Sequence, residues 1–470
     1  MSEISDAMNF ERKVTAPERF FSRSPFSIVT MVARIRGYVT GEMLEQAVGK
    51  VQQQHALLRA CIKEDTEHNL WFSSGGVQGI PIEIATRNDE QDWIAIHSEA
   101  MKIPFDFESR PAIRFILVQS PHVSELIILC HHIICDGMSL AYLARDLMLH
   151  LGDPGIMVDV VEAPPAIDLE NLPEDVSQSF LVKSLIRRMN RKWLEDSEYF
   201  DFQDYRELCK AYWDSYSHEV FSIELAEEET SSLVERCRLE QTTVNSSLAT
   251  AFCGAQSFLE WEKFHQPKIM VAADLRDRIP YSPGEGMGMY AGGTELEFKY
   301  NHKQSFWENA RRFNQQVQRK YTNKNLFSDM LNWLYLEPTI LDAIPFKEVG
   351  GLVTPESNRF EKLSAFRKKQ DVVLSILKQD NLDSLDTKLW GTAVTNLGRL
   401  DFPRKFGSLE LDRLILQPGG GVPLAKVNLV IGAVTCSGKL SLIIEFAEQA
   451  VEPNDVEKIK VKALEFLLSQ

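Results

Sequence analysis

The segment 125–151 constrains the fold most, because it joins a strongly apolar strand directly to an amphipathic helix. The run ELIILCHHII at 125–134 is rich in apolar and β-branched residues, which is typical of a buried strand. Apolar side chains then recur at helical spacing, at Leu140, Leu143, Ala144, Leu147, Met148 and Leu151. A strand followed at once by such a helix predicts a mixed α/β architecture.

Strands and helices alternate irregularly along the rest of the chain. Residues 26–37 predict a strand, and Thr40 predicts the N-cap of the helix that follows it. The second half predicts a helix at 243–259, a strand at 267–274, helices between 304 and 345, strands near 389–396, 408–416, 426–435 and 439–446, and a last helix from about 453.

The length of 470 residues exceeds what one hydrophobic core usually supports, so two subdomains are expected. Glycine, proline and acidic residues accumulate between 152 and 176, which predicts a linker. We therefore predict an N-terminal subdomain at 1–176, connecting helices at 177–217 and a C-terminal subdomain at 218–470. The predicted fold class is α/β with mixed sheets, of the α+β kind.

The end of the apolar strand carries the chemistry, in the run His131-His132-Ile133-Ile134-Cys135-Asp136-Gly137. Successive side chains of a strand face opposite ways, so one histidine belongs to the core and the other to a cavity. Histidine suits proton transfer near neutral pH, since its reference pKa is about 6.5. Gly137 lets the backbone turn sharply or lets a ligand approach closely.

Two other interpretations of this run remain open from the residues alone. A buried histidine most often has only a structural role in the core. His-His-x-x-x-Asp could also bind a metal ion, but adjacent strand histidines diverge and no third or fourth ligand follows nearby. We therefore predict no metal site. The complete four-residue pattern rarely arises by chance, which favours a catalytic role.

The run resembles the HHxxxDG signature of the thioester-dependent acyltransferase superfamily. This superfamily includes chloramphenicol acetyltransferase, nonribosomal-peptide condensation domains, alcohol acyltransferases and mycobacterial lipid-associated acyltransferases. Residues 17–59, 242–256, 271–280 (VAADLRDRIP) and 394–402 (VTNLGRLDF) resemble further stretches of the condensation and alcohol-acyltransferase branches, in the expected order. Thr395 stands where serine is common, and residues 401–407 only partly resemble the Asp-Phe-Gly-Trp-Gly stretch of plant-type enzymes.

The resemblance implies two chloramphenicol-acetyltransferase-like subdomains in a V, with a tunnel between them for the thioester donor and the acceptor. It implies that His132 is the general base. It also implies that Asp136 pairs with an arginine of the second half, with Arg276 as the first candidate and Arg278 as the second. Asn396 matches a position near the active site. His131 and Gly137 would support the site structurally.

The predicted function is transfer of an acyl group from a coenzyme A or carrier-protein thioester to a hydroxyl or amine. The donor is a substrate, and no cofactor is expected to stay bound. One alternative is a free-standing condensation enzyme of secondary metabolism, joining carrier-bound units. The other is a non-catalytic module that keeps the fold and recruits an acyl or peptidyl carrier protein.

Charge and cysteine content exclude other classes of protein. A net charge of −16 argues against nucleic-acid binding. Seven scattered cysteines without Cys-x-x-Cys spacing suit a reducing compartment. The first residues, MSEISDAMNF, lack the apolar stretch of a signal peptide, and no run of about 18 apolar residues occurs. We therefore expect a cytoplasmic protein without a membrane span.

The sequence also contains three weaker signals. The basic run at 183–192 could contact coenzyme A phosphates or an acidic carrier protein, although a solvated helix face is commoner. The glycine-rich stretch 284–293 fits a loop better than a dinucleotide site. Cys135 is expected in the core, and no Gly-x-Ser-x-Gly elbow indicates a serine hydrolase.

Overall fold

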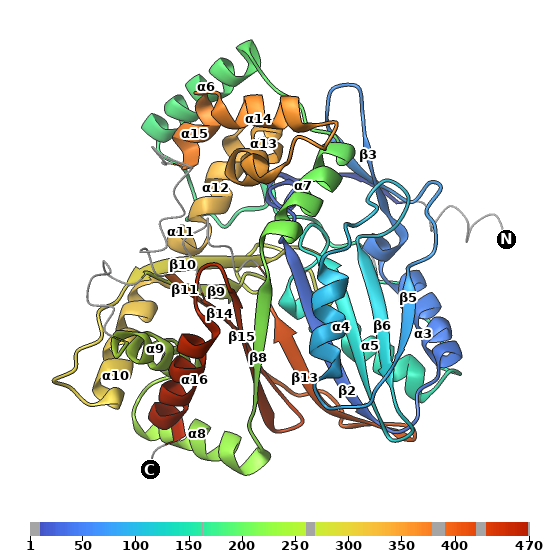
Figure 1. The fold of residues 1–470 in the computed structure, drawn as a ribbon, viewed down its shortest axis with the longest axis vertical. Coiled ribbons are helices and arrows are strands. Elements are labelled where there is room, and N and C mark those ends of the chain that lie inside the picture. Colours follow the sequence, from blue (N-terminus) through green and yellow to red (C-terminus); the bar gives the residue numbers. More distant parts are fainter. Residues whose placement is uncertain (1–9, 162, 260–267, 378–390, 420–428, 469–470) are drawn as a thin grey trace.

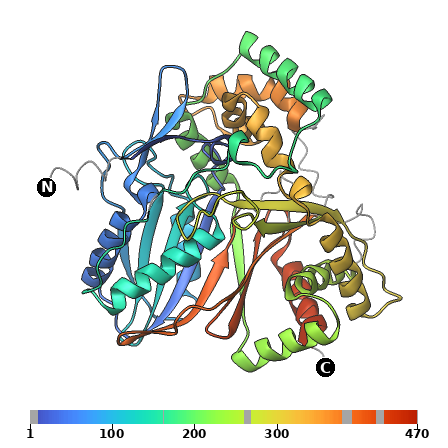
Figure 2. The ribbon, with the colours of Figure 1, turned by 180° about the vertical axis from the view of Figure 1, so that it is seen from behind.

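The computed structural model describes residues 10–161, 163–259, 268–377, 391–419 and 429–468. Two six-stranded sheets lie side by side and are flanked by helices, with a further group of helices above them in Figure 1. Figure 2 shows the same arrangement from behind. The fold is therefore mixed α/β with two sheets, as the sequence predicted.

The first sheet positions the histidine motif. Its strand order is β12-β13-β2-β7-β6-β5, with the bounds Lys405–Phe406, Leu409–Gln417, Ile28–Arg36, Val123–His131, Ile113–Gln119 and Ile82–Thr86. Strand β7 is central, antiparallel to β2 and β6, and pairs His131 with Ile28 at its end. All of β7 after Val123 is buried, which explains its continuous apolar sequence.

The second sheet has the strand order β10-β9-β11-β14-β15-β8. The bounds of these strands are Ala291–Glu297, Lys268–Asp274, Gly391–Leu400, Leu429–Cys436, Lys439–Ala447 and His218–Glu224. Strand β11 runs parallel to both of its neighbours, and the other pairs in this sheet are antiparallel. A small third sheet, β1-β4-β3, joins Glu11–Lys13, Leu70–Ser73 and Cys61–Glu64.

Helices cover each large sheet. On the first, α5 (Gly137–Gly152) packs against β2 and β13 and contacts α3 (Gly41–Gln54), whose N-cap Thr40 accepts a hydrogen bond from the Met43 amide at 3.1 Å. Helix α4 (Asp92–Met101) contacts β7 and also β8 of the second sheet. The second sheet is flanked by α8 (Glu227–Leu239), α9 (Val244–Ser257), α10 (Phe306–Lys320) and α16 (Pro453–Leu468).

A group of helices lies above both sheets in Figure 1. It comprises α6 (Phe180–Glu195), α7 (Phe202–Ser215), α12 (Ser328–Tyr335), α13 (Pro338–Val349), α14 (Phe360–Lys368) and α15 (Val372–Leu377). Short helices α2 (Ala16–Arg19) and α11 (Asn323–Leu326) and the 3-10 turns Ala56–Arg59, Leu169–Asn171 and Gly350–Leu352 complete the described elements. Within the ranges described, no helix is both long and apolar enough to cross a membrane.

Two strands from the predicted C-terminal subdomain, 218–470, belong to the sheet that carries the histidine motif. Strands β12 and β13, from residues 405–417, complete the first sheet instead of the second, because β13 pairs with β2 along its length. Sequence periodicity predicts that a segment is a strand, but it does not reveal the partner of that strand. The boundaries at 176 and 217, and the tunnel between the halves, stay predictions.

Ion pairs to Glu224 of β8 join the two large sheets. Arg34 on β2 pairs with Glu125 on β7 at 3.0 Å and with Glu224 on β8 at 2.7 Å. Arg413 on β13 also approaches Glu224, at 3.3 Å. The two guanidinium groups therefore share one carboxylate of the other sheet, and this fixes where the sheets meet.

Candidate active site at the end of strand β7

The turn between β7 and α5 holds the histidine motif. Strand β7 ends at His131, and Asp136 is the N-cap of α5, where its side chain accepts a hydrogen bond from the Ser139 amide at 2.8 Å. Aspartate is among the best N-cap residues, since its carboxylate satisfies an amide that the first helical turn leaves free. The strand end and the helix start therefore hold the four residues between them in a tight turn.

His131 is completely buried and has a partner on each ring nitrogen. Its Nε2 lies 3.2 Å from the Ser24 carbonyl oxygen, and its Nδ1 accepts a hydrogen bond from the Ile133 amide at 3.3 Å. The ring packs edge-on against Phe107, with 4.9 Å between centroids. Burial lowers the pKa of His131 to about 3. His131 is therefore a neutral residue of the core.

His132 lies beyond the strand and is only partly buried. Its Nδ1 is 3.0 Å from the Cys135 carbonyl oxygen, which can only accept, so Nδ1 carries the proton and Nε2 carries a lone pair. Burial lowers the pKa of His132 from its ordinary value, although the Cys135 carbonyl opposes this effect. A neutral imidazole with a free Nε2 can accept a proton from a substrate.

Phe21 packs on the imidazole of His132, with 4.6 Å between ring centroids and 21° between planes. The neighbouring Phe20 stacks on Trp333 of α12 at 4.0 Å, so aromatic rings from both halves of the chain meet beside His132. Sequence reasoning missed these residues individually. The only signal was the Phe-Phe pair inside the stretch 17–59, which does not reveal that one ring contacts the motif.

Asp136 faces Arg276 and is held by four hydrogen bonds. The guanidinium of Arg276 donates to both carboxylate oxygens, at 2.9 and 3.0 Å, and the amides of Ser139 and Tyr290 donate at 2.8 and 2.9 Å. Burial raises the pKa of Asp136, but Arg276 and the amides of Ser139 and Tyr290 together outweigh burial and hold that pKa below its ordinary value. Asp136 is therefore a charged structural residue, since every hydrogen bond described for it fixes the turn.

Arg276 links the end of β9 to the start of α5. Besides Asp136, it donates to the Ser139 hydroxyl at 2.9 Å and to Asp274 at 3.1 Å. The Ser139 hydroxyl in turn donates to the Gly288 carbonyl oxygen at 2.9 Å. Gly288 of the glycine-rich segment thus lies against the first turn of α5. Residues 284–290 form the predicted loop, whereas residues 291–293 begin strand β10.

The other predicted site residues are Arg278, Asn396 and Gly137, and each has its own surroundings. Arg278 does not join Asp136, because it donates to Asn323 at 3.0 Å and lies over the Tyr321 ring. Asn396 accepts a hydrogen bond from the Gly398 amide at 2.8 Å, where the register of β11 shifts. A Cβ on Gly137 would come within 2.9 Å of Leu397, so this part of β11 lies against the start of α5.

Two further observations concern a cysteine nucleophile and a metal site. Cys135 is fully buried and burial raises the pKa of its thiol, so it is a poor nucleophile. Over the described ranges, no group of three or more His, Cys, Asp or Glu side chains could hold a metal ion.

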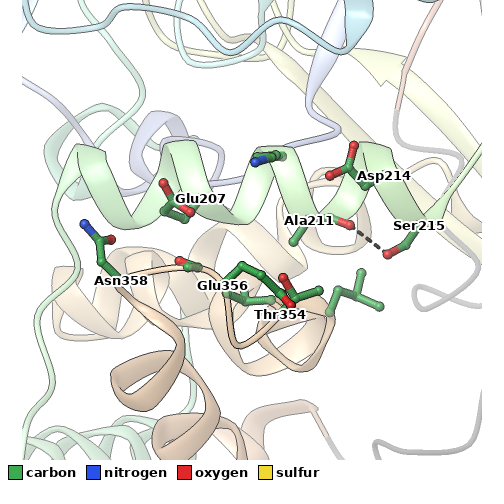
Figure 3. Close-up of a pocket in the computed structure, with 11 residues that line it drawn as sticks. Glu207, Ala211, Asp214, Ser215, Thr354, Glu356 and Asn358 are labelled. Carbon is green, nitrogen blue, oxygen red and sulfur yellow. Dashed lines mark hydrogen bonds between the residues drawn. The ribbon is translucent and has the colours of Figure 1, made fainter.

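A pocket of about 320 Å³ lies between α7 and residues 352–358 (Figure 3). Its charged residues are Glu207, Lys210, Asp214 and Glu356, and no residue of the histidine motif lines it. This pocket is therefore separate from the turn that holds His132.

The first part of the chain is similar to known proteins. Residues 14–150 match the family model described as Condensation domain. A nonribosomal peptide synthetase of Aspergillus flavus, agiA, is 30% identical over 119 residues, which is 24% of this chain and 2% of that protein. Bacitracin synthase 3 of Bacillus licheniformis is 21% identical over 263 residues, which is 55% of this chain and 4% of that protein. The chain thus covers only a small part of these relatives.

Solved structures share the fold over almost the whole chain. The trichothecene 15-O-acetyltransferase TRI3 of Fusarium sporotrichioides has a TM-score of 0.63 at 12% identity, covering 98% of this chain and 95% of that one. Polyketide synthase associated protein 5 of Mycobacterium tuberculosis has a TM-score of 0.57 at 16% identity, covering 98% of both chains. The fold and the N-terminal match confirm the predicted resemblance to the superfamily of condensation domains and chloramphenicol-acetyltransferase-like enzymes.

Proposed function

We propose that the protein is an acyltransferase that moves an acyl group from a thioester to a hydroxyl or amine, with His132 as general base. The observation that carries the proposal is the contact between His132 Nδ1 and the Cys135 carbonyl oxygen, from which the tautomer of His132 follows. Its Nδ1 donates to the Cys135 carbonyl oxygen at 3.0 Å, and this leaves the Nε2 lone pair available. The lowered pKa keeps this nitrogen unprotonated at neutral pH.

In the proposed reaction, Nε2 of His132 takes the proton from the acceptor hydroxyl or amine. The acceptor attacks the thioester carbonyl carbon, and the C–S bond breaks as the new ester or amide bond forms. The same imidazole then returns the proton to the leaving thiolate. Asp136 and Arg276 take no part in proton transfer; they hold the turn that aims His132.

The proposed donor is an acyl thioester of coenzyme A or of a carrier protein. Condensation-type synthetases among the relatives support a carrier-bound donor, and the acetyltransferase with the same fold supports a free one. No cofactor needs to stay bound for this chemistry. We also propose a cytoplasmic location, which the seven free, buried cysteines support.

The test is thiol release from a panel of acyl-coenzyme A and acyl-carrier thioesters, with alcohols and amines as acceptors. We expect His132→Ala to reduce turnover by roughly 10²–10⁴-fold. The matched control is His122→Ala, which changes an exposed histidine just before β7 and should retain full turnover. Equal turnover of the His132 variant and the wild type would refute the assignment of the base.

The second candidate is a non-catalytic module that binds a carrier protein. Wild-type protein that binds an acyl carrier, but releases no thiol with any acceptor, would favour this module. A free-standing condensation enzyme would instead give an amide only when both donor and acceptor are carrier-bound. Once carrier-bound amines are added to the acceptors, the panel separates all three alternatives.

A further inference from the structure

Helix α6 exposes large apolar side chains on its outer face. Phe180 is 74% exposed, Leu181 80% and Leu185 57%. The opposite face is packed on the neighbouring helices, with Ile186 and Trp193 buried. The Trp193 ring also donates a hydrogen bond to Thr339 at 2.9 Å. The helix is therefore firmly anchored, and its exposed apolar side chains stand on a rigid support.

The same helix carries a group of cations that lack acidic partners. In the part of the chain that the structure describes, no ion pair involves Arg187, Arg188, Arg191 or Lys192. All four are exposed. The sequence FLVKSLIRRMNRKWLE contains five basic residues and one acidic residue, whereas the whole chain has a net charge of −16. This helix is thus a positive area on an acidic protein.

The apolar and basic side chains are ordered along the helix. Leu181, Leu185, Arg188 and Lys192 follow one another at spacings of four, three and four residues, so they form one strip on the helix surface. The strip is apolar in the first two turns and cationic in the next two. Helix α6 forms the upper edge of the molecule in Figures 1 and 2, with no other element above it.

We propose that α6 docks this protein on a membrane surface that contains anionic lipids. The apolar side chains would enter the boundary between headgroups and acyl chains, and the cations would meet the phosphates. The overall negative charge would repel the rest of the protein, so only the α6 edge would face the bilayer.

A lipid surface fits α6 better than the two other anionic ligands. Coenzyme A phosphates need a concave site, and neither pocket described in the structure is lined by α6. An acidic protein would match the cations, but protein interfaces seat their apolar anchors in pockets on both partners. Helix α6 instead lies at an outer edge of the fold, where Leu181 and Leu185 are exposed.

The test is co-sedimentation of the full chain with lipid vesicles, either neutral phosphatidylcholine or the same lipid with about 30% phosphatidylglycerol. We expect the wild type to bind the anionic vesicles at least about tenfold more tightly than the neutral ones. The triple variant Arg188→Gln/Arg191→Gln/Lys192→Gln should lose about tenfold or more of this affinity, and Leu181→Ser/Leu185→Ser should also weaken binding.

The matched control is Arg238→Gln/Leu239→Ser, which changes an exposed cation and an exposed leucine on α8. This control should bind vesicles like the wild type, and circular dichroism should show that every variant is folded. Equal binding of wild type to neutral and anionic vesicles, or wild-type binding by both α6 variants, would overturn the proposal. Absence of any vesicle binding by the wild type would also overturn it and would favour an acidic protein partner.

Discussion

His131 and His132 are adjacent in sequence, yet the contacts of their ring nitrogens differ. His131 is enclosed by Ser24, Ile133 and Phe107, and both of its ring nitrogens have partners. His132 is partly exposed, and only its Nδ1 has a described partner. The end of β7 separates them, because one lies in the strand and the other in the turn.

The difference shows what makes a histidine available for catalysis. Burial lowers the pKa of both side chains, so both are neutral near pH 7. Neutrality alone therefore does not distinguish them. The distinction lies in the second ring nitrogen, which is occupied in His131 and open in His132. Three experiments test this comparison. They remove the Asp136 carboxylate, lower the pH around His131, and remove the Phe21 ring.

The largest expected effect comes from removing the carboxylate that fixes the turn. Asp136→Ala leaves the buried Arg276 guanidinium without its bidentate partner, so we expect the free energy of unfolding to fall by about 3–5 kcal/mol. Urea unfolding at pH 7 measures this loss. Asp274→Ala removes the more exposed partner of the same arginine and should cost only about 0–1 kcal/mol. Equal losses would show that Asp136 does not organise the turn.

A moderate loss of stability is expected at acidic pH, because the buried His131 resists protonation. The pKa of His131 is about 3 in the folded protein and about 6.5 in the unfolded chain, so only the unfolded chain binds this proton in between. Protonation of His131 therefore does not affect the free energy of unfolding above about pH 6.5. The free energy of unfolding declines as the pH falls toward 3, by at most about 1.4 kcal/mol per pH unit for this group.

Thermal unfolding between pH 6.5 and 4.5 measures that decline. In His131→Asn, the free energy of unfolding should depend less steeply on pH, although the variant is less stable throughout. A pH dependence identical to that of the wild type would show that His131 does not resist protonation.

The smallest expected effect concerns Phe21, which we regard as a positioning residue. Phe21→Ala removes the ring stacked on His132 and admits water, so turnover should fall by about two- to tenfold. The pKa of His132 should rise toward its ordinary value, because desolvation lowers it in the wild type. The acid limb of the profile of kcat/KM against pH should therefore move to higher pH.

Phe20→Ala provides the control for that shift. It removes a stacking contact with Trp333 but leaves the described stacking partner of His132 in place. This variant should be destabilised without a shift of the acid limb. Identical shifts in both variants would mean that Phe21 acts only through general packing.

Local features of the fold were predictable from sequence, and long-range pairing was not. The strand at 125–134, the helix at 138–151 and the N-cap Thr40 correspond to β7, α5 and the start of α3. Each depends on side chains a few residues apart, which periodicity and capping detect. The pairing of β13 with β2 depends on residues hundreds of positions apart, and no local pattern encodes it.

The candidate site was likewise predictable from sequence only in its local features. The motif and its turn were visible in sequence, but Arg276 could be chosen over Arg278 only through a family resemblance. The structure adds the Tyr290 amide, the Ser139 hydroxyl and the Phe21 ring, which single-sequence reasoning could not place. Backbone amides and stacked rings leave no distinctive residue spacing, so their roles appear only in three dimensions.

The place of β13 in the first sheet has a consequence for synthesis of the chain. Residues 409–417 lie between β12 and β2, so this sheet is incomplete until residue 417 has left the ribosome. Until then β2 has an unpaired edge, of the kind that attracts other strands and promotes aggregation. This edge therefore stays open to wrong pairing while the roughly 400 residues between β2 and the end of β13 are synthesised. A protein truncated at the predicted boundary, residue 217, would lack β13, so the edge of β2 would stay unpaired.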